Sequence, residues 1–132
     1  MKFASLRVIT GDVRRLVEFY EQATGVGPTW YTDDFAELAF PSFTLAVGSR
    51  RTMDLFGAGA ARTGENHSAI FEFLVDDVDR DYERLQGIVS DFVQTPTTQP
   101  WGNRSLLFRD PDGNLVNFFT PVTPGAIRKF NP

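Results

Sequence analysis

The feature that most restricts the fold of this chain is an internal repeat with a spacing of 65 residues. A shift by that distance superimposes five identical pairs: Ala4 on Ala69, Asp12 on Asp77, Val13 on Val78, Arg15 on Arg80 and Glu18 on Glu83. Such a repeat indicates one supersecondary unit that occurs twice. With 132 residues, the chain has room for two such units within a domain of ordinary size.

The two halves also share an order of predicted elements. Residues 3–10 and 70–75 are rich in apolar and β-branched types and predict strands. Asp12 and Asp77 follow as helix N-caps. Each cap precedes an apolar stripe at helical spacing: Val13, Leu16, Val17, Tyr20 and Ala23 in one half, Val78, Tyr82 and Leu85 in the other. Further strands are predicted at 29–32, 35–40, 43–47, 88–93, 105–108 and 115–120.

These elements predict an α+β chain with two βαβββ modules. Module one covers about 1–48, a linker about 49–66, module two about 67–121, and an irregular tail with several prolines covers 122–132. The linker is rich in glycine and shows no period. It is either a flap over a binding pocket or a disordered connector, and the sequence leaves both open.

Composition excludes several classes of function. The net charge of −4 and the pI near 4.9 disfavour nucleic acid as a partner, since phosphate binding needs a basic surface. The chain has no cysteine, which excludes disulfides and zinc–thiolate sites. No apolar run reaches the roughly 20 residues that span a bilayer. The first residues do not form a signal peptide, so we expect a cytoplasmic protein that does not bind membranes.

Four stretches resemble the vicinal-oxygen-chelate superfamily of glyoxalases, bleomycin-resistance proteins and dioxygenases. They run from Asp12 to Gly25, from Val75 to Leu85, from Gln99 to Gly102 and from Asp110 to Leu115. The third, Gln-Pro-Trp-Gly, is similar to a segment of the bleomycin-resistance-like branch. The fourth, Asp-Pro-Asp-Gly-Asn-Leu, resembles the signature turn before the last strand of the family.

The resemblance implies that the two modules form a curved, incompletely closed eight-stranded barrel, with the active site on its concave face. It also implies a homodimer, because many single-domain members of the family pair and build their ligand pockets across the interface.

Family enzymes hold a divalent metal, and the resemblance places the four ligand positions of this chain at Ser5, Ala46, Ile70 and Asn117. Ile and Ala have no donor atom, and neutral Ser and Asn are weak donors. We therefore expect no metal and no cofactor. His67 is the only histidine and lies three residues before the Ile70 position, which favours a surface residue at the start of a strand.

Period-two alternation nominates the residues of the concave face. With Ser5, Ile70 and Asn117 on that face, Arg7, Glu72 and Phe119 share it, and an almost wholly apolar set packs under the helices: Leu6, Val8, Phe71, Phe73, Val116 and Phe118. Arg7 and Glu72 are 65 residues apart, so the repeat makes them equivalent. We expect them to lie near each other and to contact a polar group of a ligand.

Two aromatic residues complete the predicted ligand-binding set. Trp101 stacks on planar ligand rings if it behaves as in the related resistance proteins, or else it packs in the core or the dimer interface. Phe35, at a strand start, is the second candidate.

The leading hypothesis is a metal-free, dimeric binding protein for a planar aromatic small molecule, such as an antibiotic that it sequesters. The alternative is a lyase, isomerase or dioxygenase of the same family with an atypical or absent metal site, in which Glu72 or His67 acts as acid–base. A third is a small-molecule sensor or an accessory domain of a biosynthetic pathway. No catalytic residue is assigned, and the vacant ligand positions favour binding over catalysis.

Overall fold

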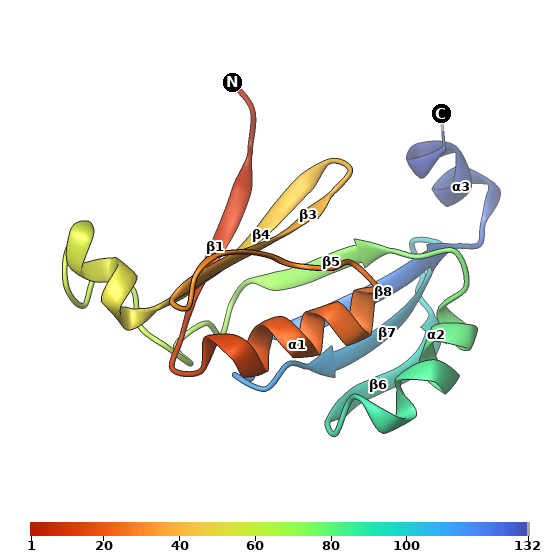
Figure 1. Cartoon of the computed structure of the whole chain (residues 1–132). Coiled ribbons are helices and arrows are strands. Elements are labelled where there is room, and N and C mark those ends of the chain that lie inside the picture. Colours follow the sequence, from red (N-terminus) through yellow and green to blue (C-terminus); the bar gives the residue numbers. More distant parts are fainter. Residues whose placement is uncertain (132) are drawn as a thin grey trace. The chain divides into compact units, whose positions relative to one another are not determined.

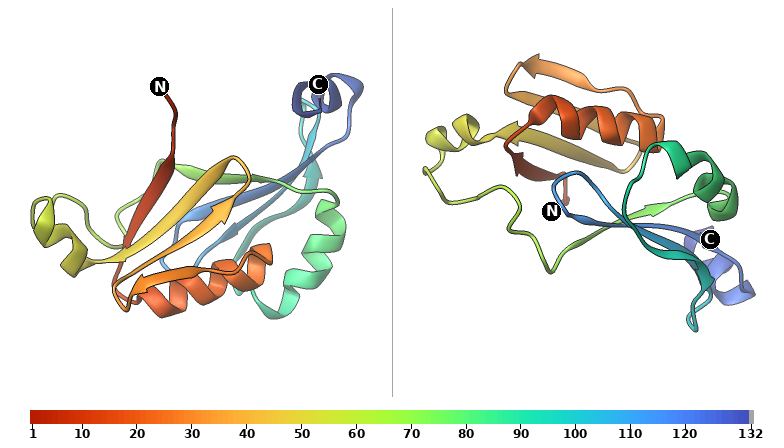
Figure 2. Two further views of the ribbon diagram at one scale, coloured as in Figure 1. Left: turned by 45° about the horizontal axis from the view of Figure 1, so that its top comes forward. Right: turned by 90° about the horizontal axis from the view of Figure 1, so that it is seen from below.

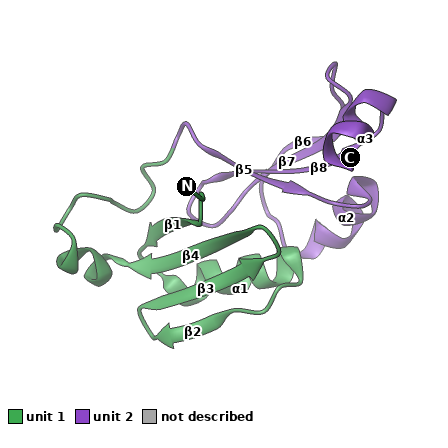
Figure 3. Ribbon diagram, turned by 90° about the horizontal axis from the view of Figure 1, so that it is seen from above, with its two compact units in different colours: residues 1–66 green, residues 67–132 purple. Residues whose placement is uncertain are grey.

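A computed structural model describes residues 1–131 of the chain and divides it into two compact units, Met1–Asn66 and His67–Pro132 (Figure 3). The boundary falls at the residue where the second module was expected to begin. Each unit contains one four-stranded mixed sheet, and the two sheets have the same topology.

Unit 1 begins with β1 (Ser5–Thr10) and α1 (Val13–Thr24), followed by β2 (Thr29–Thr32), β3 (Phe35–Phe40) and β4 (Phe43–Ser49) (Figure 1). The strand order is β1-β4-β3-β2, with β1 parallel to β4 and the other pairs antiparallel. A short 3₁₀ helix, η1 (Arg50–Leu55), follows β4.

Unit 2 repeats this plan with β5 (Ile70–Leu74), α2 (Val78–Arg84), the 3₁₀ turn η2 (Leu85–Gly87), β6 (Phe92–Thr98), β7 (Asn103–Arg109) and β8 (Leu115–Pro121). Its strand order is β5-β8-β7-β6, again with one parallel pair, β5 with β8. The α+β class and the two βαβββ modules are therefore confirmed.

The predicted caps explain where helices α1 and α2 start. The carboxylate of Asp12 accepts a hydrogen bond from the backbone N–H of Arg15, and that of Asp77 from Arg80, both at 3.1 Å. Such a cap satisfies one of the N–H groups that a helix start leaves without a partner. Helix α1 ends at Gly25, whose φ of 77° is left-handed and suits glycine.

One face of each sheet is covered by the helix of its own unit, as Figures 1 and 2 show for α1 and α2. The helix-facing side chains are apolar and buried: Leu38, Leu45 and Val47 in unit 1, and Leu106, Phe108, Val116 and Phe118 in unit 2. The rings of Phe108 and Phe118 meet edge to face at 5.1 Å. Alternation along the strands predicts this layer, and it places the other face of each sheet, including Arg7 and Glu72, away from the helices.

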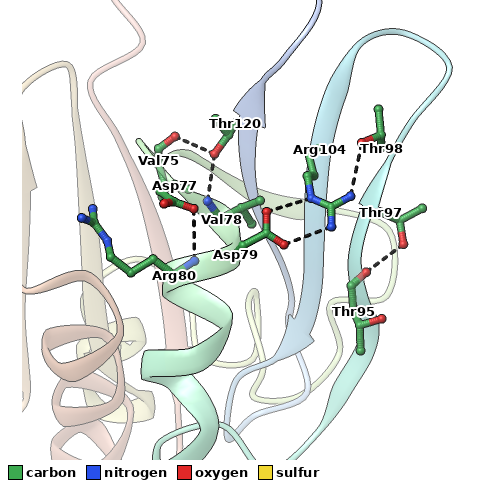
Figure 4. A network of polar contacts seen from close by, with 10 residues as sticks. All are labelled: Val75, Asp77, Val78, Asp79, Arg80, Thr95, Thr97, Thr98, Arg104 and Thr120. Atoms are coloured by element: carbon green, nitrogen blue, oxygen red, sulfur yellow. Dashed lines mark hydrogen bonds and ion pairs between the residues drawn. The ribbon is translucent and has the colours of Figure 1, made fainter.

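A polar network joins the start of α2 to the sheet of unit 2 (Figure 4). The guanidinium of Arg104 on β7 donates to both carboxylate oxygens of Asp79, at 2.9 and 3.0 Å. The hydroxyl of Thr120 on β8 accepts from the N–H of Val78 at 3.1 Å and donates to the carbonyl of Val75 at 2.9 Å. These bonds fix the end of β5 and the first turn of α2 against two neighbouring strands.

The predicted turn between β7 and β8 is held by one buried carboxylate. Asp110 accepts from the N–H groups of Asp112 and Asn114, both at 2.9 Å, and from the side-chain amide of Asn114 at 2.8 Å. Gly113 adopts a φ of 84°, which L-residues rarely reach. This motif therefore shapes the turn that aligns the last strand.

Three expectations from the sequence are wrong in detail: one strand, the tail and the linker. The strand predicted at 88–93 is β6 at Phe92–Thr98, and Val89, which follows η2, is buried in the core instead. β6 is an edge strand with register shifts, and such a strand tolerates Pro96 and a polar sequence.

The tail is not irregular, because helix α3 spans Pro124–Phe130. Thr123 caps it, Pro124 has the φ of a first helical turn, and the Phe130 ring packs on Phe119 at 5.1 Å. The linker likewise contains η1. Along residues 1–131, no helix combines the length and the apolar character needed to cross a membrane.

Candidate functional site

A pocket of about 420 Å³ opens on unit 1, on the face of the sheet away from α1. Its walls come from β1, from the β2–β3 turn and from η1 with the residue that follows it. The residues that define it are Arg7, Phe35, Thr52, Leu55 and Phe56, with Thr32, Asp34 and Arg51 at its border.

Small residues of β4 form the sheet beside the pocket. In the register, Ala46 pairs with Arg7, and Gly48 pairs with both Ile9 and Phe35. A Cβ at Gly48 would lie 2.8 Å from Thr52 Oγ1 and 3.6 Å from the Phe35 ring. The missing side chain at Gly48 therefore makes the space in which Thr52 and Phe35 sit.

The guanidinium of Arg7 lies over two aromatic rings. Its central carbon is 4.8 Å from the centroid of Phe35 and 5.1 Å from that of Phe56. Contacts of this kind stabilise a partly exposed cation by about 0.5–1 kcal/mol each. Among residues 1–131, no carboxylate pairs with Arg7 and no oxygen accepts a hydrogen bond from its guanidinium, so its N–H groups face solvent.

An ion pair fixes η1 to the β2–β3 turn. Arg51 donates from Nε to the Asp34 carboxylate at 3.2 Å and approaches it with Nη2 at 3.1 Å. The carbonyl of Asp34 also accepts from the N–H of Ser49 at 2.9 Å, and Thr52 Oγ1 donates to the Ser49 carbonyl at 2.7 Å. The first part of the expected linker is thus an ordered wall that holds Phe56 beside Arg7.

Tyr31 extends the aromatic surface beyond the pocket. Its ring lies 5.8 Å from that of Phe35. The carboxylate of Glu37 accepts a hydrogen bond from the Tyr31 hydroxyl, and this bond, with the negative charge of Glu37, raises the pKa of Tyr31 above its usual value. Tyr31 thus holds the Glu37 carboxylate, whereas Arg7 has no ion-pair partner among residues 1–131.

The predicted site residues of unit 2 form a different arrangement. The side-chain amide of Asn117 donates to the Glu72 carboxylate at 2.8 Å, and the other Asn117 atom, Oδ1, is buried without a partner among residues 1–131. Ile70 is half exposed at the start of β5, whereas Phe119 is buried against Phe130 of α3.

Trp101 lies at the tip of the β6–β7 hairpin and is 68% exposed. Its neighbour Gly102 has a φ of 97° and donates to the Gln99 carbonyl, which closes the turn. A Cβ at Gly102 would overlap Thr123 Oγ1, the cap of α3. Gly102 thus has a structural role, and Trp101 is free to contact a ligand or another chain.

The structure brings Arg7 and Phe35 together, and Glu72 and Asn117 together, each pair within one unit. Ser5 is exposed two residues before Arg7 and does not line the pocket. The expected proximity of Arg7 and Glu72 stays a prediction; each lies on the face of its own sheet that is away from the helix.

The residues at the family's metal positions do not fit a divalent ion. The register pairs Arg7 with Ala46 and Glu72 with Asn117, so Ala46 and Asn117 are equivalent in the two units. Ala46 and Ile70 carry no donor atom, and the neutral oxygens of Ser5 and Asn117 are weak donors for a divalent ion. Within residues 1–131, no group of three or more His, Cys, Asp or Glu side chains is placed to hold a metal ion.

Sequence reasoning missed Leu55 and Phe56. They are 87% and 70% exposed, and large apolar side chains on so polar a segment are a signal that could have indicated a binding wall. The contact of Phe56 with Arg7 depends on the path of η1, which no periodicity reveals.

The two βαβββ units and a pocket beside the first strand define a class of small α+β proteins built from a duplicated module. The model of the Glyoxalase/Bleomycin resistance protein/Dioxygenase superfamily matches residues 2–118, and the chain belongs to this superfamily.

Proteins similar to this chain cover nearly its whole length. The uncharacterized protein YraH of Bacillus subtilis is 29% identical over 125 residues, which cover 90% of this chain and 98% of YraH. A glyoxalase/bleomycin resistance protein/dioxygenase from Nocardioides has a TM-score of 0.78 at 22% identity, over 95% of this chain and 86% of its own. A family enzyme from Burkholderia phytofirmans has a TM-score of 0.83 at 16% identity, over 92% of this chain and 100% of its own. At such identities the two structures show the fold alone.

Proposed function

We propose that this protein binds a planar, partly aromatic small molecule in the unit 1 pocket, and that it does so without a divalent metal. The observation that carries the proposal is the arrangement of Phe35 and Phe56 around Arg7 in an open pocket of about 420 Å³. That volume lies in the range of small-molecule sites, which are mostly apolar with a few placed polar groups.

The exposure of the pocket wall supports binding. Leu55 and Phe56 leave most of their surface in water, although burying a side chain of that size is worth about 1.5–3 kcal/mol. A flat ligand against Phe35 and Phe56 would recover part of this free energy. Sequestration of an antibiotic, as in the resistance proteins of the family, is one biological use of such binding.

The test is calorimetric titration with 2-naphthoate, quinoline-2-carboxylate and bleomycin. We expect at least one of them to bind with a Kd below about 1 mM. Phe35→Leu and Phe56→Leu should each weaken binding about 2- to 12-fold, since an aromatic contact contributes about 0.5–1.5 kcal/mol beyond area.

Phe3→Leu is the matched control, because Phe3 is also an exposed ring of unit 1 but stacks on Phe43 at 5.5 Å, outside the pocket. Equal affinity of the Phe35, Phe56 and Phe3 variants would contradict the proposed site. Elemental analysis after incubation with Ni, Zn, Mn or Fe(II) should find under about a tenth of an equivalent of metal per chain.

A second candidate function is suggested by the Glu72–Asn117 pair. The exposed carboxylate of Glu72 is oriented by the Asn117 amide, an arrangement that suits a general acid or base. An enzyme of the family that acts through Glu72 would convert a compound bound at unit 2, and Glu72→Gln would stop that conversion. Mass spectrometry of the compound after incubation separates this enzyme from a binding protein.

A further inference from the structure

We propose that the pocket is selective for planar aromatic monoanions, with Arg7 as the residue that binds the carboxylate. This inference rests on the proposed function, because it names the class of ligand for the same pocket. It starts from the charges around the pocket, which leave one positive charge without a partner.

Three charged side chains line the pocket. The carboxylate of Asp34 is bound by Arg51 at 3.1 Å, which leaves little net charge at that border. Arg7 is the third, and among residues 1–131 it makes no ion pair. The lining therefore carries a net charge of about +1 on a chain whose net charge is −4.

The nearest carboxylate to Arg7 on the same face of the sheet is that of Glu37, and it does not pair with Arg7. Glu37 pairs with Ala46 from one side, and Arg7 pairs with Ala46 from the other. Two strand spacings, roughly 10 Å, therefore separate the backbones of Arg7 and Glu37. Glu37 accepts the hydrogen bond of Tyr31 instead. The side chains packed around Arg7, from β3 and from the end of η1, are the apolar rings of Phe35 and Phe56.

The geometry of Arg7 favours a carboxylate over other groups. Guanidinium is planar and presents its N–H donors at its edge, so a cation that lies over aromatic rings keeps a donor edge for a bidentate carboxylate. A planar aromatic ring system attached to that carboxylate would extend toward Phe35 and Phe56. One unpaired positive charge matches a monoanion, and a dianion would leave a negative charge uncompensated.

The experiment is a matched titration series of one ring system. 2-Naphthoate, 2-naphthamide and 2-naphthylmethylamine share the naphthalene plate and differ in charge. With the wild-type protein we expect the carboxylate to bind at least about 10-fold more tightly than the amide, and the amine to bind most weakly. Added salt should reduce the difference between carboxylate and amide, because it screens the exposed charge.

Variants assign the selectivity to one residue. Arg7→Met should remove the preference for the carboxylate and leave the affinity for the amide within about 3-fold. Arg7→Lys keeps the positive charge but loses the two parallel N–H donors that bind both carboxylate oxygens, so it should retain only part of the preference for the carboxylate. Arg14→Met is the matched control, because Arg14 also stacks on a ring, that of Trp30 at 5.0 Å, but lies on α1.

The outcomes separate the two proposals. Equal binding of carboxylate and amide, or a preference that survives in Arg7→Met, would overturn the charge selectivity and leave the aromatic pocket intact. Absence of binding by every member of the series would overturn both. Thermal melting of each variant verifies that the protein is folded, and loss of the two ring contacts of Arg7 should lower the melting temperature by only about 2–8 °C.

Discussion

Gly48→Ala adds one carbon beside η1 and tests whether the position of η1 determines ligand affinity. The new Cβ would stand 2.8 Å from Thr52 Oγ1, a distance that Cβ atoms essentially never show, so Thr52 must rotate. Rotation breaks the 2.7 Å hydrogen bond from Thr52 to the Ser49 carbonyl, which holds the first turn of η1. The Phe35 ring and the Ile9 side chain, both 3.6 Å away, are in ordinary contact and need not move.

The expected change in stability is small because two effects oppose each other. Loss of the Thr52 hydrogen bond costs about 0.5–1.5 kcal/mol. Gly48 does not have a positive φ, so alanine fits its backbone and stabilises the folded state by about 0.4–1 kcal/mol through the unfolded chain. The free energy of unfolding should therefore stay within about 1 kcal/mol of the wild type.

Ligand affinity should change more than stability. A loosened η1 displaces Leu55 and Phe56 from the pocket wall, and we expect the affinity for 2-naphthoate to fall about 3- to 10-fold. Urea unfolding and calorimetric titration measure the two quantities on the same sample. Gly87→Ala is the control: no atom lies within 4 Å of its Cβ position, it is in η2 of unit 2, and it should leave affinity unchanged.

Two results would refute this reasoning. Wild-type affinity in Gly48→Ala would show that η1 does not shape the ligand site. A loss of several kcal/mol in stability would show that the substitution disturbs the sheet itself, and any loss of affinity would then have another cause.

Three further predictions concern stability. The hydrogen bonds from Arg104 lower the pKa of Asp79 below its ordinary value of 3.8. This carboxylate therefore stabilises the fold at pH values above 3.8, and its contribution is lost as the pH falls through the lower pKa of the folded state. Asp79→Asn should reduce the loss of stability that urea unfolding measures between neutral and acidic pH. Gly102→Ala forces a strained φ and displaces the Thr123 cap, which should cost roughly 2–4 kcal/mol and expose α3 to limited proteolysis. Phe118→Ala, at the centre of the unit 2 core, should cost about 3–5 kcal/mol in chemical denaturation.

Much of the fold could be predicted because its signals are local. Asp12 and Asp77 cap their helices, the apolar stripe of α1 from Val13 to Ala23 is buried, and Asp110 shapes the turn before β8. Each of these depends on residues within a few positions of one another. The repeat then extended the assignment of one half to the other.

The misplaced elements depend on tertiary contacts. β6 is a polar edge strand that pairs with β7, and α3 is a seven-residue helix whose Phe130 needs the ring of Phe119 to pack against. An isolated helix of that length is unstable in water, so α3 depends on its contact with β8.

The candidate site likewise combines residues with local sequence signals and residues placed by tertiary contacts. Arg7 followed from strand alternation and Phe35 from its position at a strand start, but the sequence paired Arg7 with Glu72 rather than with Phe56. Phe56 reaches Arg7 through η1, whose path is set by the ion pair of Arg51 with Asp34, seventeen residues earlier in the chain. Spacing alone cannot reveal a contact of that kind.

The most direct test of the central claim is a ¹H–¹⁵N NMR titration of the wild-type protein with 2-naphthoate. Binding in the unit 1 pocket predicts that the largest shift changes fall on the amides of Arg7, Phe35, Thr52 and Phe56. Changes concentrated at Trp101, or around Glu72 and Asn117, would place the ligand in unit 2 and contradict the account.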